Sequence, residues 1–66
     1  MSLALELRFH TDVAAWLAET RAGRVGQLIN GSAQDFADYR ARVAYIRALD
    51  EVAAECQDIE NRIMRT

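Results

Sequence analysis

Proline and lysine are absent from the sequence, and its 66 residues contain a single cysteine. Because no proline ring stops a helix, any break in a helical segment must come from other residues. One cysteine cannot form a disulfide within the chain, which fits a reducing compartment. Every uncharged stretch is far shorter than the roughly 20 residues of a membrane span. Glu6 interrupts the apolar amino terminus, so we also expect no signal peptide.

The rest of the composition is that of a small globular domain. Hydrophobic residues make up 52% of the chain and charged residues 27%, a balance too apolar for a disordered tail. All eight basic residues are arginine, and ten acidic residues leave a net charge of −2. This charge disfavours a general nucleic-acid binder, and the length allows one domain spanning residues 1–66.

One short stretch, Asn30-Gly31-Ser32, interrupts a chain that otherwise favours helix from end to end. Glycine, and less readily asparagine, adopts the left-handed conformation that ends many helices. Ser32 is a good N-cap residue, and Asp35 follows where a carboxylate suits the dipole of a second helix. We therefore predict a tight turn between two antiparallel helices. The alternative, an anion-binding loop, lacks the G-x-x-x-x-G-K-[ST] pattern.

Helices are expected over residues 3–29 and 33–64, which makes the fold an all-α antiparallel two-helix hairpin. In the first helix, the apolar positions at helical spacing are Leu3, Leu7, Ala14, Leu17, Val25 and Leu28. The second contains a heptad-like row of Phe36, Tyr39, Val43, Ile46, Leu49, Val52, Cys56, Ile59 and Ile63. Three-residue steps from Ile46 to Val52 should overwind the packing there. We predict an intrachain core of Leu17, Val25, Leu28, Phe36, Tyr39, Val43, Ile46, Leu49, Val52 and Cys56.

A second set of large apolar residues belongs to the other side of the first helix. Its members follow steps of four, four and three, which places them roughly opposite the core row: Leu5, Phe9, Val13 and Trp16. A single partner helix covers only one of these two faces. We therefore predict that the second set contacts another chain. The alternative is that Phe9 and Trp16 overhang a wide intrachain interface.

Two glycines near the turn, Gly23 and Gly26, weaken the first helix by about 1 kcal/mol each relative to alanine. Three interpretations remain open: a kink, an early helix end, or close approach of a neighbouring backbone.

No catalytic, cofactor or metal site is predicted. His10 comes roughly level with Cys56 when the hairpin closes, but a nucleophile also needs an orienting group, an oxyanion site and a pocket. Cys56 is interpreted as a small core residue, and no second His or Cys lies one helical turn from His10. Arg40, Arg42 and Arg47 cluster, but interleaved acidic residues argue against nucleic-acid binding.

The stretch LINGSAQDFADYRARVAYIRALDEVAAEC resembles small helical proteins encoded among the head, packaging and connector genes of tailed bacteriophages. Their pattern is a leucine-ending helix, a Gly with a small residue, a later Tyr, and then a small residue, Ile and Leu. The matching positions are Leu28, Gly31, Ser32, Tyr39, Ala44, Ile46 and Leu49, with Ala44 where the pattern more often has glycine. The resemblance implies a multicopy virion or assembly component attached to capsid, portal or connector, without enzyme activity.

Small domains without a disulfide or metal rarely obtain more than about 3–5 kcal/mol from one core and commonly oligomerise. We therefore expect a structural, non-enzymatic protein that acts through helix packing, in the virion or the cytoplasm of a bacterial host. Its expected partner is a second copy of the chain, or a capsid or portal protein; no cofactor and no membrane are expected. The alternative is a small helical adaptor or inhibitor of a host or phage protein, and an enzyme subunit ranks third.

Overall fold

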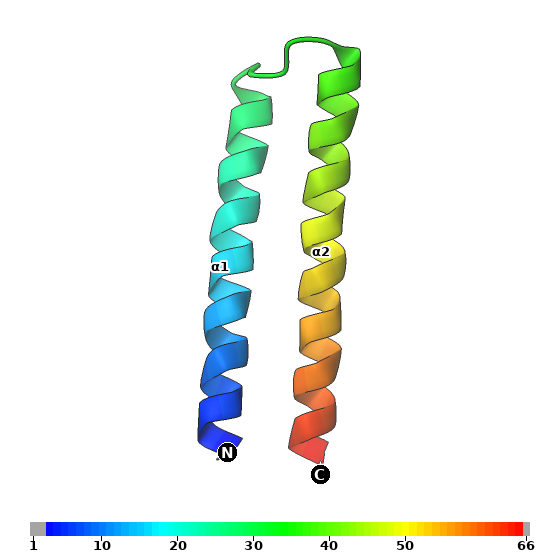
Figure 1. Cartoon of the computed structure of the whole chain (residues 1–66). Coiled ribbons are helices and arrows are strands. Elements are labelled where there is room, and N and C mark those ends of the chain that lie inside the picture. Colours follow the sequence, from blue (N-terminus) through cyan, green and yellow to red (C-terminus); the bar gives the residue numbers. More distant parts are fainter. Residues whose placement is uncertain (1–2, 66) are drawn as a thin grey trace.

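The computed structural model describes residues 3–65 and contains two α-helices, α1 (Leu3–Ile29) and α2 (Phe36–Arg65). The helices run antiparallel side by side, and residues 30–35 connect them at one end of the molecule (Figure 1). Both chain ends lie at the other end, and the molecule measures 47 × 15 × 15 Å. The predicted all-α antiparallel hairpin is confirmed. α1 has the predicted bounds, whereas α2 begins at Phe36 rather than at residue 33.

The first helix continues through both of its glycines and ends at Ile29. It is rich in Ala, Leu, Arg and Glu, which have high helix propensities. A β-carbon added to Gly23 or Gly26 would meet nothing within 4 Å. Neither glycine therefore ends the helix early, and neither is needed for close approach of α2.

Gly26→Ala is expected to stabilise the hairpin by about 1 kcal/mol, because alanine fixes the helical backbone at a lower entropic cost. The new methyl group meets no atom within 4 Å, so no steric penalty offsets this gain. Urea denaturation followed by circular dichroism measures the difference from the wild-type chain. An unchanged or lower unfolding midpoint would contradict the prediction.

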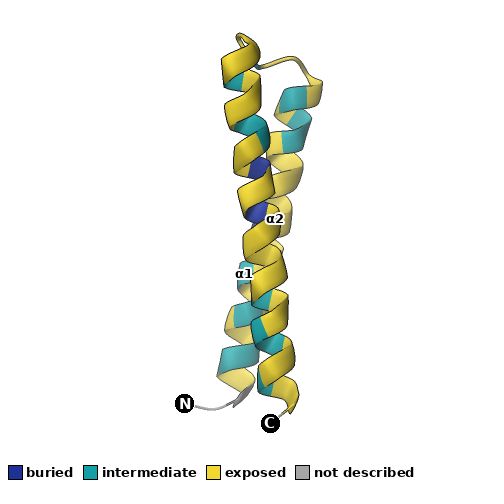
Figure 2. Cartoon of the chain, turned by 90° about the vertical axis from the view of Figure 1, so that its right-hand side faces the viewer, coloured by how far each residue is buried: buried dark blue, intermediate teal, exposed yellow. Residues whose placement is uncertain are grey.

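Within residues 4–65, the buried core of the hairpin is small and consists of Leu17, Ile46 and Leu49, which are 5%, 8% and 8% exposed. Figure 2 shows that most of the surface of both helices is exposed. Half-buried apolar residues extend the core in both directions: Leu7, Val13, Val25 and Leu28 on α1, and Val43, Cys56, Ile59 and Ile63 on α2. Half-buried polar residues interrupt it: Glu6, His10 and Thr20 on α1, and Asp38, Arg42 and Glu60 on α2. The helices are therefore held together by a narrow, partly polar seam.

Three predicted core residues are wrong: Phe36, Tyr39 and Val52 are 73%, 47% and 48% exposed. Val52 lies outside the seam because the buried and half-buried positions continue at seven-residue spacing from Leu49 through Cys56 to residue 63. Because Val52 is not part of the seam, the prediction of overwound packing between Ile46 and Val52 loses its basis. Phe36 and Tyr39 lie in the first turn of α2, where only the end of α1 faces them. Their rings stack on each other, with centroids 6.4 Å apart.

Candidate interaction surface

Three of the four residues predicted to contact another chain are exposed on α1. Leu5, Phe9 and Trp16 are 59%, 66% and 57% exposed. Val13 is half-buried instead, because it lies one helical turn before Leu17 on the side that faces α2. Val13 is therefore part of the seam, and its assignment to the partner surface is wrong.

The second helix adds two exposed apolar residues that follow the same spacing. Tyr45 and Val52 are 42% and 48% exposed and are seven residues apart, as Phe9 and Trp16 are. Trp16 directly precedes buried Leu17, and Tyr45 directly precedes buried Ile46. Consecutive residues are about 100° apart around a helix. On each helix, a row of exposed apolar residues therefore lies about a quarter turn from the seam.

Both rows lie on the same side of the hairpin. The two helices face each other and also run in opposite directions, so the residue before a seam position points to the same side on both. The cation–π contact of Arg24 with Tyr45, 4.7 Å from guanidinium to ring centroid, joins α1 to α2 on this side. Asp50, which follows seam residue Leu49, lies on the opposite side, where its Oδ1 accepts a hydrogen bond from Arg21 Nε at 2.6 Å. We call the exposed apolar surface the open face: Leu5, Phe9, Trp16, Tyr45 and Val52.

Sequence reasoning identified only the α1 half of this open face. The apolar pattern does not single out Tyr45, and it predicts Val52 in the core. The available signal was the seven-residue spacing of the pair, which repeats that of Phe9 and Trp16. Recognising that both pairs share one side also requires the position of the seam on α2, which the apolar pattern misplaces by including Val52.

A second, smaller group of exposed apolar residues lies at the turn end of the hairpin, where α1 ends and α2 begins. Ile29 and Phe36 are 79% and 73% exposed, and Tyr39 stacks on Phe36. We call these three residues the tip cluster. Arg40 and Arg47 line the same shallow depression as Phe36 and Tyr39, so positive charge borders the tip cluster.

The turn closes α1 with a set of backbone hydrogen bonds centred on Gly31, whose φ is +76°. The Gly31 N–H donates to the Leu28 carbonyl at 3.0 Å, and the Ser32 N–H donates to the Gln27 carbonyl at 3.1 Å. This pair of bonds is the Schellman motif, which satisfies carbonyls left free at a helix end. The predicted helix stop at Asn30-Gly31 is confirmed.

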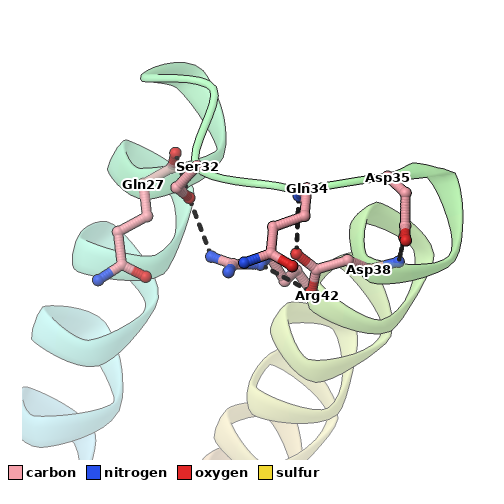
Figure 3. A network of polar contacts seen from close by, with 6 residues as sticks. All are labelled: Gln27, Ser32, Gln34, Asp35, Asp38 and Arg42. Atoms are coloured by element: carbon pink, nitrogen blue, oxygen red, sulfur yellow. Dashed lines mark hydrogen bonds and ion pairs between the residues drawn. The ribbon is translucent and has the colours of Figure 1, made fainter.

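Ser32 belongs to the end of α1 and not, as predicted, to the start of α2. Its hydroxyl donates to the Gln27 carbonyl at 2.8 Å and accepts from Arg42 Nη1 at 2.9 Å (Figure 3). The N-cap of α2 is Asp35, whose Oδ1 accepts from the Asp38 N–H at 2.7 Å. Two capping residues stand close together in the sequence, and each caps a different helix.

Asp38 connects the turn to α2. Its carboxylate accepts from the Gln34 N–H at 3.0 Å and from Arg42 Nε at 3.1 Å. These two donors hold the pKa of the Asp38 carboxyl below its ordinary value of 3.8. Ionised Asp38 therefore stabilises the folded chain above that pH, and this contribution is lost as the pH falls through the folded-state pKa.

Asp38→Asn is expected to lower the melting temperature at neutral pH and to reduce its fall on acidification below pH 3.8. The amide cannot ionise, so the variant lacks the charge that Gln34 and Arg42 stabilise. Thermal melts followed by circular dichroism across this range measure both effects. Asp12→Asn, at an exposed position on α1, is the matched control. If the melting temperatures of the wild-type and Asp38→Asn chains fell equally with pH, ionised Asp38 would not stabilise the fold.

Other chemistry is sparse in the part of the chain that the structure describes. No group of three His, Cys, Asp or Glu side chains within residues 3–65 is arranged to hold a metal ion. His10 and Cys56 are both half-buried in the seam. Neither described helix combines the length and apolarity that a membrane span requires. The open face, with its five exposed apolar residues, is our candidate functional surface.

No protein-family model matches the chain, and neither the curated proteins nor the solved structures yield a match.

Proposed function

We propose that this chain is a non-enzymatic structural protein that packs its helices against other chains of a larger assembly. The observation that carries the proposal is the contrast between a core of three buried residues and an open face of five exposed apolar residues. Burying a Trp or Phe side chain contributes roughly 1.5–3 kcal/mol. Covering the open face would therefore add stability comparable to the few kcal/mol that one small core supplies. Exposed apolar patches commonly mark protein interfaces.

Within this class, we assign the chain to the head, portal or connector region of a tailed bacteriophage, in the virion or the bacterial cytoplasm. The assignment is supported by the resemblance of residues 28–56 to small proteins of that gene cluster. Gly31 and Ser32 of the shared pattern close the turn, and Ile46 and Leu49 lie in the core. The pattern therefore contains the residues on which the hairpin depends.

Quantitative mass spectrometry of purified virions, from a phage that encodes this sequence, tests the assignment. The expected result is several copies per particle, with portal or capsid protein recovered alongside a tagged chain. Absence from both virions and assembly intermediates would overturn the assignment. Capture of a single regulatory host or phage protein in that case would favour the adaptor alternative.

A further inference from the structure

We propose that the open face is covered by the open face of a second copy of this chain, giving a symmetric dimer with four helices. This inference rests on the proposed function, because it names the first partner that the packing surface meets. A two-fold dimer is the commonest closed assembly, and it brings the same patch of both copies together.

The exposed area of the chain is large enough for such a dimer interface. A compact folded protein of 7.4 kDa exposes about 4,200 Å². This chain exposes 5267 Å², roughly 1,000 Å² more than a compact protein of that mass. A standard protein interface covers about 800 Å² on each partner. Two separate chains expose about 10,500 Å², whereas a compact protein of twice the mass exposes about 7,000 Å². The difference, about 3,500 Å² in total, lies in the range that obligate homodimers bury.

The arrangement of the two rows on each helix is that of a four-helix bundle. Every helix in such a bundle packs against two neighbours, so it needs two apolar rows about a quarter turn apart. On α1 these are the seam through Leu17 and the exposed row of Phe9 and Trp16. On α2 they are the seam through Ile46 and the row of Tyr45 and Val52. The seven-residue spacing within each exposed row suits packing against another helix of the same kind.

Charge also favours a second copy on this face rather than on the tip cluster. Charges of both signs border the open face, because Arg24, Glu55 and Arg62 each precede a half-buried residue, and Arg62 pairs with Glu55 at 3.3 Å. The net charge of −2 leaves only weak repulsion between two copies. Two copies meeting through their tip clusters would instead bring Arg40 and Arg47 of both chains close together. The tip cluster thus supplies a control surface of similar chemistry.

Sedimentation equilibrium of the full chain, over two orders of magnitude in concentration, measures the assembly directly. The wild-type chain is expected to pass from monomer to dimer and to stop there. Trp16→Ala and Phe9→Ala should each raise the dissociation constant by about 100-fold or more, because every substitution removes two buried aromatic side chains from a symmetric dimer. Val52→Glu should abolish dimerisation, whereas Phe36→Glu in the tip cluster should leave it unchanged.

The single tryptophan gives a readout that requires no variant. Trp16 fluorescence of the wild-type chain should shift to longer wavelength on dilution, with the same midpoint as dissociation. A monomer at every concentration, an assembly larger than two chains, or a dimer that loses stability through Phe36→Glu but not Val52→Glu would each overturn the proposal.

The two proposals fail separately. Dimerisation through the open face without any association with virions would retain the dimer and overturn the phage assignment. A monomer that copurifies with portal or capsid protein would overturn the dimer and retain the structural role.

Discussion

Leu49→Ala is expected to unfold most of the isolated hairpin. Leu49 is 8% exposed and is one of three residues in the buried core. Truncating a buried leucine to alanine costs roughly 2–5 kcal/mol, from lost burial and from the cavity left behind. A domain of this size obtains only about 3–5 kcal/mol from its core. The loss is therefore comparable to the whole stability of a single chain.

Val52→Ala is the matched control, because Val52 lies on the same helix and is 48% exposed. Below the concentration at which chains associate, this substitution should change the free energy of unfolding much less than Leu49→Ala does. Circular dichroism during urea denaturation compares the two variants with the wild-type chain. Equal losses would mean that Leu49 contributes no more to the single hairpin than Val52 does.

Gly31→Val is expected to destabilise the hairpin by more than about 1 kcal/mol, because a β-branched residue is strained at positive φ. Gly31 has φ +76°, and a β-carbon there would meet no atom within 4 Å. The expected loss therefore comes from backbone strain and not from a clash with a neighbour. Thermal denaturation measures it as a lower melting temperature.

Gly31→Asn separates this cause from others, since asparagine adopts the left-handed conformation more readily than valine. The loss for Gly31→Asn should be clearly smaller. Gly26→Ala provides the opposite case, a glycine in a regular helix whose replacement should stabilise the chain. If the valine variant melted at the same temperature as the wild-type chain, Gly31 would not be essential to the turn.

The hairpin and its turn could be predicted from sequence because their signals are local. The residues around Gly31 carry the conformational preference that ends α1, and the long helix-favouring segments need no distant information. The first residue of α2 could not be predicted from local signals alone. Ser32 and Asp35 are both good caps, and which one begins the helix depends on hydrogen bonds across the turn. Arg42 donates to Ser32, while Asp35 accepts from Asp38.

The membership of the core could be predicted only in part, because it depends on the path of the second helix. The predicted core residues Leu17, Ile46 and Leu49 are buried. The predicted surfaces of Val13 and Val52 are both wrong, because the two residues lie near a boundary that apolar spacing alone does not locate. Burial there is decided by where the facing helix passes, and polar residues such as His10 occupy seam positions that a hydrophobic pattern overlooks.

The elongated shape determines how association would appear in solution scattering. The Cα radius of gyration is 15.2 Å, whereas a compact domain of this length has about 11 Å. A compact protein with a radius of 15.2 Å would contain about 160 residues, more than two copies of this chain. Two rods placed side by side become thicker but not longer. Pairing through the open face should therefore double the forward X-ray scattering while the radius of gyration changes little.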